Sequence, residues 1–166
     1  MSRMRGPYGW WAAVLVAALL CGGAGWTYAR AAGDENRAYA EERDTALTAG
    51  RQHVARLSGL DASRAEEGLR AWLDASAGEL RAELKKEKPR TDVSARATVT
   101  DAALTALDTR AGTAELIATV RVEITPGPDR ADGSPRTERK RLEATLARTP
   151  DGWKVTALTA VPTAGA

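Results

Sequence analysis

The sequence predicts an α+β fold in which a single N-terminal transmembrane helix precedes three helices and a four-stranded, curved antiparallel sheet. Three observations lead to this prediction: an uncharged run of nineteen residues, an apolar stripe at helical spacing after it, and a later change to alternating apolar and polar residues. The chain of 166 residues has room for one domain beyond the uncharged run.

The uncharged run extends from Trp10 to Tyr28. As a helix it spans roughly 28 Å, close to the thickness of the hydrocarbon core of a bilayer. Arg3 and Arg5 precede it without any acid, so the positive-inside rule predicts a cytoplasmic tail over residues 1–9 and an extracytoplasmic C-terminal domain in a single-pass cell-membrane protein. Aromatic side chains suited to the two membrane interfaces are the predicted anchors: Trp10, Trp11, Trp26 and Tyr28.

Two alternatives make this run a signal that is removed. The first is a lipoprotein signal at Cys21, but the bulky Leu20 occupies the position where a small residue is needed. The second is cleavage after Ala31, although the apolar run is longer than the roughly 7 to 15 residues typical of a signal peptide. We favour an uncleaved anchor, and cleavage after Ala31 stays open.

The region beyond the anchor begins with a predicted helical linker over residues 29–44, which is rich in Ala, Arg and Glu and lacks Pro. The roll domain is predicted over residues 45–162, followed by a disordered C-terminus over 163–166. Its first helix ends near Ser58–Gly59. The apolar face of this helix recurs at helical spacing at Leu47, Gly50, Val54 and Leu57.

Two capping boxes predict the starts of the next two helices. In each, a serine stands three residues before a glutamate, so each side chain can accept a hydrogen bond from the other's backbone N–H. The pairs are Ser63 with Glu66 and Ser76 with Glu79. Pro89 is expected to end the third helix.

Alternating residues from Thr91 onward predict four strands in sequence. In the first strand Asp101 interrupts the apolar alternation, and Ala102, Leu104 and Ala106 resume it one position later, which predicts a β-bulge. The second strand alternates most regularly, between Leu116 and Ile124. A long loop, a third strand and a tight turn at Pro150, Asp151 and Gly152 lead to a last strand that ends near Pro162.

Charge and composition exclude several classes of partner. Lys and Arg number 24 and Asp and Glu 22, and two of the basic residues, Arg3 and Arg5, precede the apolar run, so the rest is formally neutral. A neutral domain lacks the electrostatic footprint of a nucleic-acid binder. The single cysteine lies in the predicted span and there is one histidine, so neither a metal site nor a cofactor is expected.

Short motifs in the roll resemble the actinobacterial Mce-associated (mammalian cell entry-associated) membrane proteins. The motifs are Thr45 to Arg51, Ser76 to Gly78 and Asp151 to Val155, and they accompany a single span and a long meander. The resemblance implies a nuclear-transport-factor-2-like (NTF2-like), cystatin-like roll. It also implies a non-catalytic accessory role, with protein partners, in an Mce-type lipid or sterol uptake system of the cell envelope. Family members often have Thr at Ser76 and an aromatic at Glu79, which leaves the subfamily open.

Similar architecture is seen in bitopic scaffold proteins of type IV secretion. The sequence therefore favours a non-catalytic, single-span scaffold whose roll docks partners of an envelope complex. The alternative is a membrane-anchored or secreted roll enzyme or small-ligand binder acting on steroid-like or polyketide-like molecules, since such rolls include isomerases that hold an acid in an apolar pocket.

Few residues are candidates for catalysis or ligand binding. His53 has no evident acid partner, so it is expected to be a surface or rim residue. Asp101 is expected to occupy the bulge or face water. Trp72 and Trp153 could line a lipid or steroid pocket, although a chain without Phe needs both to fill its core.

A cluster of basic residues in the third strand has two interpretations. Its members are Arg136, Arg139, Lys140 and Arg141. They could contact anionic lipid headgroups, making lipid a possible ligand. More commonly, such a run is the solvated edge of a strand, where charge discourages pairing between sheets.

Overall fold

A computed structural model describes residues 36–88, 93–126 and 134–162. The chain divides into two units, Met1–Glu41 and Glu42–Ala166. The predicted tail, the predicted span with Trp10, Trp11, Trp26 and Tyr28, and the predicted disordered C-terminus all lie outside the described residues. Within the described ranges, no helix is both long and apolar enough to cross a bilayer.

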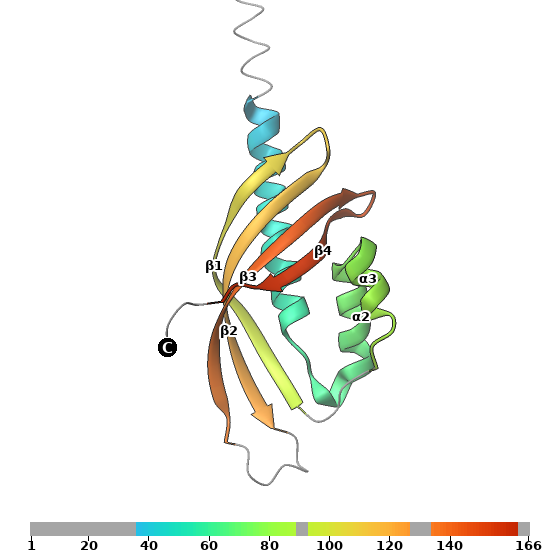
Figure 1. Cartoon of the computed structure of the whole chain (residues 1–166), viewed down its shortest axis with the longest axis vertical. Coiled ribbons are helices and arrows are strands. Elements are labelled where there is room, and N and C mark those ends of the chain that lie inside the picture. The colour runs from blue at the N-terminus through green and yellow to red at the C-terminus, as the bar shows by residue number, and fades with distance from the viewer. Residues whose placement is uncertain (1–35, 89–92, 127–133, 163–166) are drawn as a thin grey trace, which may run out of the picture. The chain divides into compact units, whose positions relative to one another are not determined.

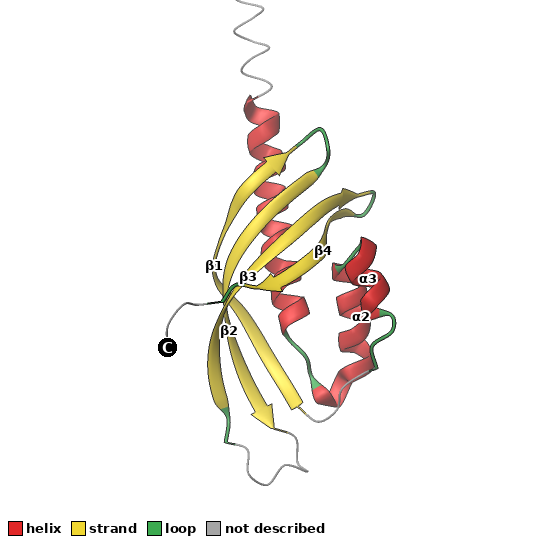
Figure 2. Cartoon of the chain, in the orientation of Figure 1, coloured by secondary structure: helices red, strands yellow, loops and turns green. Residues whose placement is uncertain are grey.

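Residues 36–41 of the first unit are helical, and the second unit begins with helical residues 42–58. The remaining elements are η1 (Ala62–Arg64), α2 (Ala65–Ala75), α3 (Gly78–Leu84), β1 (Val93–Asp108), β2 (Thr113–Pro126), β3 (Arg136–Thr149) and β4 (Gly152–Ala160). The strands form one antiparallel sheet in the order β1-β2-β3-β4, which confirms the predicted meander (Figures 1 and 2).

The sheet curves where extra residues enter its strands. β1 changes register between Val99 and Asp101, which confirms the predicted bulge. A second shift, between Leu104 and Ala106, was not predicted. It turns Ala106 outward and Leu107 inward, so the prediction that Ala106 continues the inner row is wrong. Bulges increase local twist and bend the strand, so these two shifts help the sheet to curl.

The core lies between the 42–58 helix and the concave face of the sheet. Its fully buried side chains include Val54 from the helix and Leu116, Val120, Leu146 and Val155 from the sheet. Gly50 gives the helix its close approach, because a Cβ built there would lie 2.7 Å from Leu116 Cδ1 and 3.3 Å from Leu146 Cδ2. The absence of a side chain at Gly50 therefore sets how closely the helix packs on the sheet.

A polar cluster ties the start of this helix to β3 and β4. Glu42 Oε1 accepts hydrogen bonds from Trp153 Nε1 and from Arg148 Nη1, both at 3.1 Å. The Trp153 ring is 2% exposed and belongs to the core. Gly152 before it has a φ of +99°, so the Asp-Gly-Trp motif combines a tight turn with a core anchor.

Neither predicted capping box forms. Asp61, not Ser63, caps the η1–α2 segment, and its Oδ1 accepts from Ser63 N at 3.0 Å. Ser76 Oγ donates to Leu73 O at 3.2 Å, and α3 begins after Ala77 without a side-chain cap. Ser76 is drawn away from capping because it is buried and makes an isolated parallel bridge to Val155. The third helix ends at Leu84, well before Pro89.

We predict that Gly50→Leu destabilises the domain by roughly 1 to 3 kcal/mol, because the added side chain meets leucines that are already fully buried. Urea denaturation monitored by tryptophan fluorescence measures the change. Thr48→Leu, at an exposed position of the same helix, is the matched control. An unchanged midpoint for Gly50→Leu would show that the helix does not pack on the sheet at this point.

Candidate functional site

A groove of about 690 Å³ opens at the rim of the roll. It lies between the end of the 42–58 helix, the η1–α2 segment and the first half of β1, with Glu123 and Thr125 of β2 at its edge. The apolar lining consists of four alanines, one leucine and one ring: Ala55, Leu60, Ala71, Trp72, Ala95 and Ala97.

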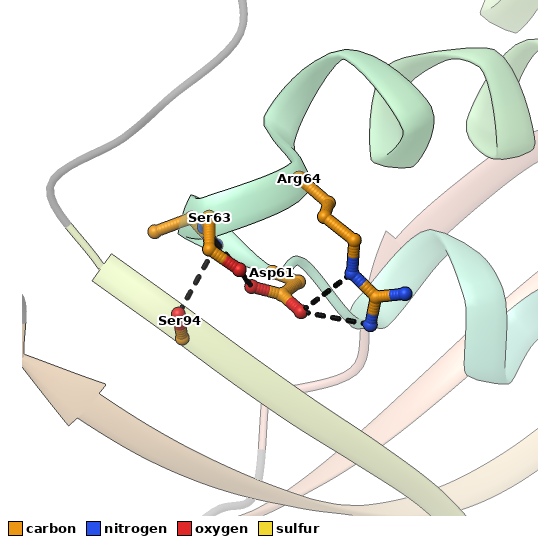
Figure 3. Close-up of polar contacts among 5 residues, drawn as sticks. Asp61, Ser63, Arg64 and Ser94 are labelled. Carbon is orange, nitrogen blue, oxygen red and sulfur yellow. Dashed lines mark hydrogen bonds and ion pairs between the residues drawn. The ribbon is translucent and has the colours of Figure 1, made fainter.

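The groove is built by joining the chain after the helix to the outer edge of β1. Leu60 and Ala95 exchange two backbone hydrogen bonds, each of 2.7 Å. One step further, Ala62 N–H donates to Ser94 Oγ at 3.0 Å. Figure 3 shows the contact at Ser94 beside the Asp61 cap. The bridge fixes the end of the helix against β1. One wall of the groove is therefore backbone that is held by the helix on one side and by the strand on the other.

Trp72 forms another wall. Its indole Nε1 donates to the carbonyl oxygens of Arg56 at 2.8 Å and Gly59 at 2.9 Å. Arg56 O also accepts from Gly59 N at 3.2 Å, so the indole adds a second hydrogen bond there and satisfies the Gly59 carbonyl just beyond the helix end. The half-buried ring therefore lines the groove and also stabilises the helix end that borders it.

Five charged side chains surround the groove, but two neutralise each other. Arg64 Nη2 lies 3.0 Å from Asp61 Oδ2. The Ser63 hydroxyl and then the Arg64 guanidinium hold the pKa of Asp61 below its usual value, so this carboxyl stays ionised. Arg56 and Arg96 form no ion pair with the described residues, and neither does Glu123. Among the described residues, the rim of the groove thus carries Arg56, Arg96 and Glu123 outside any ion pair, with Arg96 and Glu123 directly opposite each other in the sheet.

His53 lies in the core and does not line the groove. Its side chain is 8% exposed, so the prediction of a surface or rim residue is wrong. Burial lowers the pKa of His53, a hydrogen bond to the backbone of Trp153 opposes the shift, and Lys154 and Arg56 lower the pKa further. Its Nδ1 has no hydrogen-bond partner within the described part of the chain.

The other predicted site residues are dispersed. Asp101 is exposed on β1, as expected for a residue at a bulge. Trp153 fills the core, whereas Trp72 reaches the groove, so the two tryptophans do not form one pocket. Among the described side chains, no group of three or more His, Cys, Asp or Glu residues is arranged to hold a metal ion.

The groove itself was missed by sequence reasoning. Its backbone bridge joins Leu60 to Ala95, and no local pattern marks such a distant pair. One signal was available: Asp61 stands directly before a helix, where a carboxylate is a favoured N-cap.

We predict that the free energy of unfolding falls as the pH drops below 6.5, the ordinary pKa of histidine, because the unfolded chain takes up the proton more readily than buried His53. The slope from this one group is at most about 1.4 kcal/mol per pH unit and ends at its lowered pKa. Denaturation curves between pH 7.5 and 5.5 measure it. His53→Leu should remove this slope, whereas Gln52→Leu, its exposed neighbour, should keep it; equal slopes would contradict the prediction.

No protein-family model matches this sequence, and no curated protein matches it. Solved structures do match. CagV, a VirB8 homolog of the type IV secretion system of Helicobacter pylori, is 14% identical with a TM-score of 0.53, over 72% of this chain and 98% of that chain. An IcmL-like type IV secretion system protein from Legionella pneumophila is 12% identical with a TM-score of 0.54, over 75% of this chain and 95% of that chain.

An Ntf2 like protein involved in plasmid conjugation is 10% identical with a TM-score of 0.52, over 75% of this chain and 51% of that chain. At such low identities the likeness concerns the fold alone. Three helices and a curved four-stranded antiparallel sheet, together with these matches, give the domain an NTF2-like α+β fold.

Proposed function

We propose that this protein is a non-catalytic, single-span membrane scaffold whose NTF2-like domain docks protein partners of a cell-envelope complex. The observation that carries the proposal is the filled interior of the roll. In the space where a roll enzyme would hold its reacting groups, Leu116 and Leu146 are fully buried and Trp153 is 2% exposed. With the interior occupied, the surface of the roll is what remains for function.

The rim groove is the proposed docking surface. It is lined by alanines and the Trp72 ring, and its border carries Arg56, Arg96 and Glu123, which form no ion pair with the described residues. Interfaces commonly combine an aromatic anchor, a guanidinium and a polar rim. Type IV secretion proteins such as CagV share this fold, and an envelope complex is the setting that their names suggest for this chain.

A more specific version of this proposal is that the envelope complex is an Mce-type lipid or sterol uptake system. It is supported by the resemblance at Thr45 to Arg51, Ser76 to Gly78 and Asp151 to Val155. Ser76 and Trp153 also have structural roles in the roll, so these motifs serve the fold as well. The identity of the proteins that co-purify therefore decides between an uptake system and a secretion system.

Ligand binding in the same groove is a second candidate function, favoured by the half-buried Trp72 ring on its wall. A steroid-like molecule seated there would quench or shift the fluorescence of Trp72, and Trp72→Phe would remove that response while the buried Trp153 still emits.

The first prediction from the proposal concerns the anchor. The full chain should remain in the membrane pellet after carbonate extraction, and its intact mass should include residues 1–31. A chain lacking residues 10–28 should be soluble, because that apolar run supplies the hydrophobic anchor. A mature protein that begins after Ala31 and leaves the pellet would overturn the proposed anchor.

The second prediction concerns the groove. The tagged full chain, extracted in a mild detergent, should retain protein partners that Arg96→Glu releases, because the change reverses a charge on the groove border. Arg110→Glu makes the same charge change at the exposed β1–β2 turn and should retain the partners. Recovery of no membrane partner, or equal release by both variants, would count against docking in the groove.

A further inference from the structure

We infer that three arginines on the convex face of the sheet bind the phosphate group of anionic lipid headgroups. This inference rests on the proposed membrane anchoring. Arg121 of β2 is directly opposite Arg139 of β3, and Arg141 is opposite Thr119, the residue two positions before Arg121. All three arginines are exposed, and they alternate with inward residues that are mostly buried, so they share one face. We call this set the arginine triangle.

The arginine triangle places like charges side by side. Directly opposed residues in an antiparallel pair have Cβ atoms about 4.5 to 5.5 Å apart, and diagonal neighbours about 7 to 8 Å, so the three guanidinium groups can reach one common point. Within the described residues, none of the three forms an ion pair. Opposed like charges destabilise a sheet, so this arrangement favours an anion whose oxygens can accept hydrogen bonds from more than one guanidinium group.

Acidic residues border the arginine triangle, but among the described residues none forms an ion pair with it. On the same face, register places Glu123 opposite Arg96 and Thr137, Asp101 opposite Thr119, and Glu143 opposite Ile117. These carboxylates border the triangle. Between them, the short side chains of Thr98 and Thr119 leave room above the sheet for an oxyanion.

The charged run that opens β3 is divided between two faces. Arg136 and Lys140 are on the other face, where both pair with Glu138, at 2.9 and 3.3 Å. β4 pairs with β3 only from Leu142 onward, so the start of β3 is also a strand edge within the described sheet. Edge protection therefore explains Arg136 and Lys140, but it does not explain Arg121, which belongs to a strand paired on both sides.

A single lipid phosphate group matches the size of the arginine triangle better than an extended polyanion does. The chain beyond the predicted anchor is formally neutral, so attraction must come from a local cluster. Guanidinium groups bind phosphate oxygens in a bidentate manner, and each basic group near an anionic membrane contributes on the order of 1 kcal/mol. A domain anchored to a bilayer has that phosphate at high local concentration.

Arginine footprinting of the full chain in nanodiscs tests this inference. The probe is phenylglyoxal, which modifies free guanidinium groups, with mass spectrometry as the readout. In discs containing phosphatidylglycerol, modification of Arg121, Arg139 and Arg141 should slow by about fivefold relative to phosphatidylcholine discs. Arg110 should be modified at the same rate in both.

Matched double variants identify the site. Arg139→Gln with Arg141→Gln should abolish protection of Arg121, whereas Arg136→Gln with Lys140→Gln removes equal charge from the same strand and should preserve it. Loss of like-charge repulsion should also raise the melting temperature of the double variant Arg139→Gln with Arg141→Gln, and its cooperative melting shows that it folds. Continued protection of Arg121 in the first double variant would overturn the inference.

Three other outcomes would also overturn it: equal rates in both discs, protection by inorganic phosphate alone in phosphatidylcholine discs, and protection that requires added membrane proteins. The second would indicate a soluble phosphate ligand, and the third an acidic protein partner. Each is separate from failure of the proposed function, because a chain that stays in the membrane and keeps its partners can still lack this lipid contact.

Discussion

The close packing of the 42–58 helix on the sheet at Gly50 is the contact on which the rest of this domain depends. With no side chain at Gly50, the helix backbone reaches Leu116 and Leu146, and the buried side chains of Val54 and Ala46 join the same core. The sheet bends around the helix through its bulges. Where the helix ends, Gly59 and Leu60 carry the chain onto the edge of β1, and the rim groove forms there.

In this arrangement the interior of the roll is filled by side chains, and the surfaces proposed for binding lie outside it. Alanines and leucines fill the concave side of the sheet, leaving His53 buried beside Trp153 instead of facing a cavity. The two surfaces proposed for binding are the rim groove and the arginine triangle. Arg96 and Glu123 at the groove border lie on the same sheet face as the triangle, whereas Arg56 comes from the helix end. The proposed scaffold could contact partners at both surfaces without remodelling its core.

Much of the fold could be predicted because each strand carries its own alternating pattern. The meander, the bulge at Asp101 and the end of the first helix near Ser58 follow from local periodicity. The caps could not be predicted, since Asp61 and Ser63 compete for the same helix start and tertiary contacts decide between them. Burial of His53 depends on which helix face meets Trp153, a residue a hundred positions away.

The two candidate surfaces were harder to predict from the sequence, because both depend on pairing between residues that are far apart in the chain. The basic run in β3 was visible, but register divides it and brings in Arg121 from β2. The groove needs the bridge between Leu60 and Ala95. Trp72 could be assigned to the core or to a pocket, and the structure gives it both a helix end to cap and a groove to line.

The two isolated bridges also affect how copies of this protein meet one another. Leu60 covers part of the free edge of β1, and Ser76 covers part of the free edge of β4. Confinement to a membrane would bring copies to high two-dimensional density, where open strand edges favour polymerisation into continuous sheets. By shielding one position on each outer strand, the segments around the helices reduce the open edge available for such pairing.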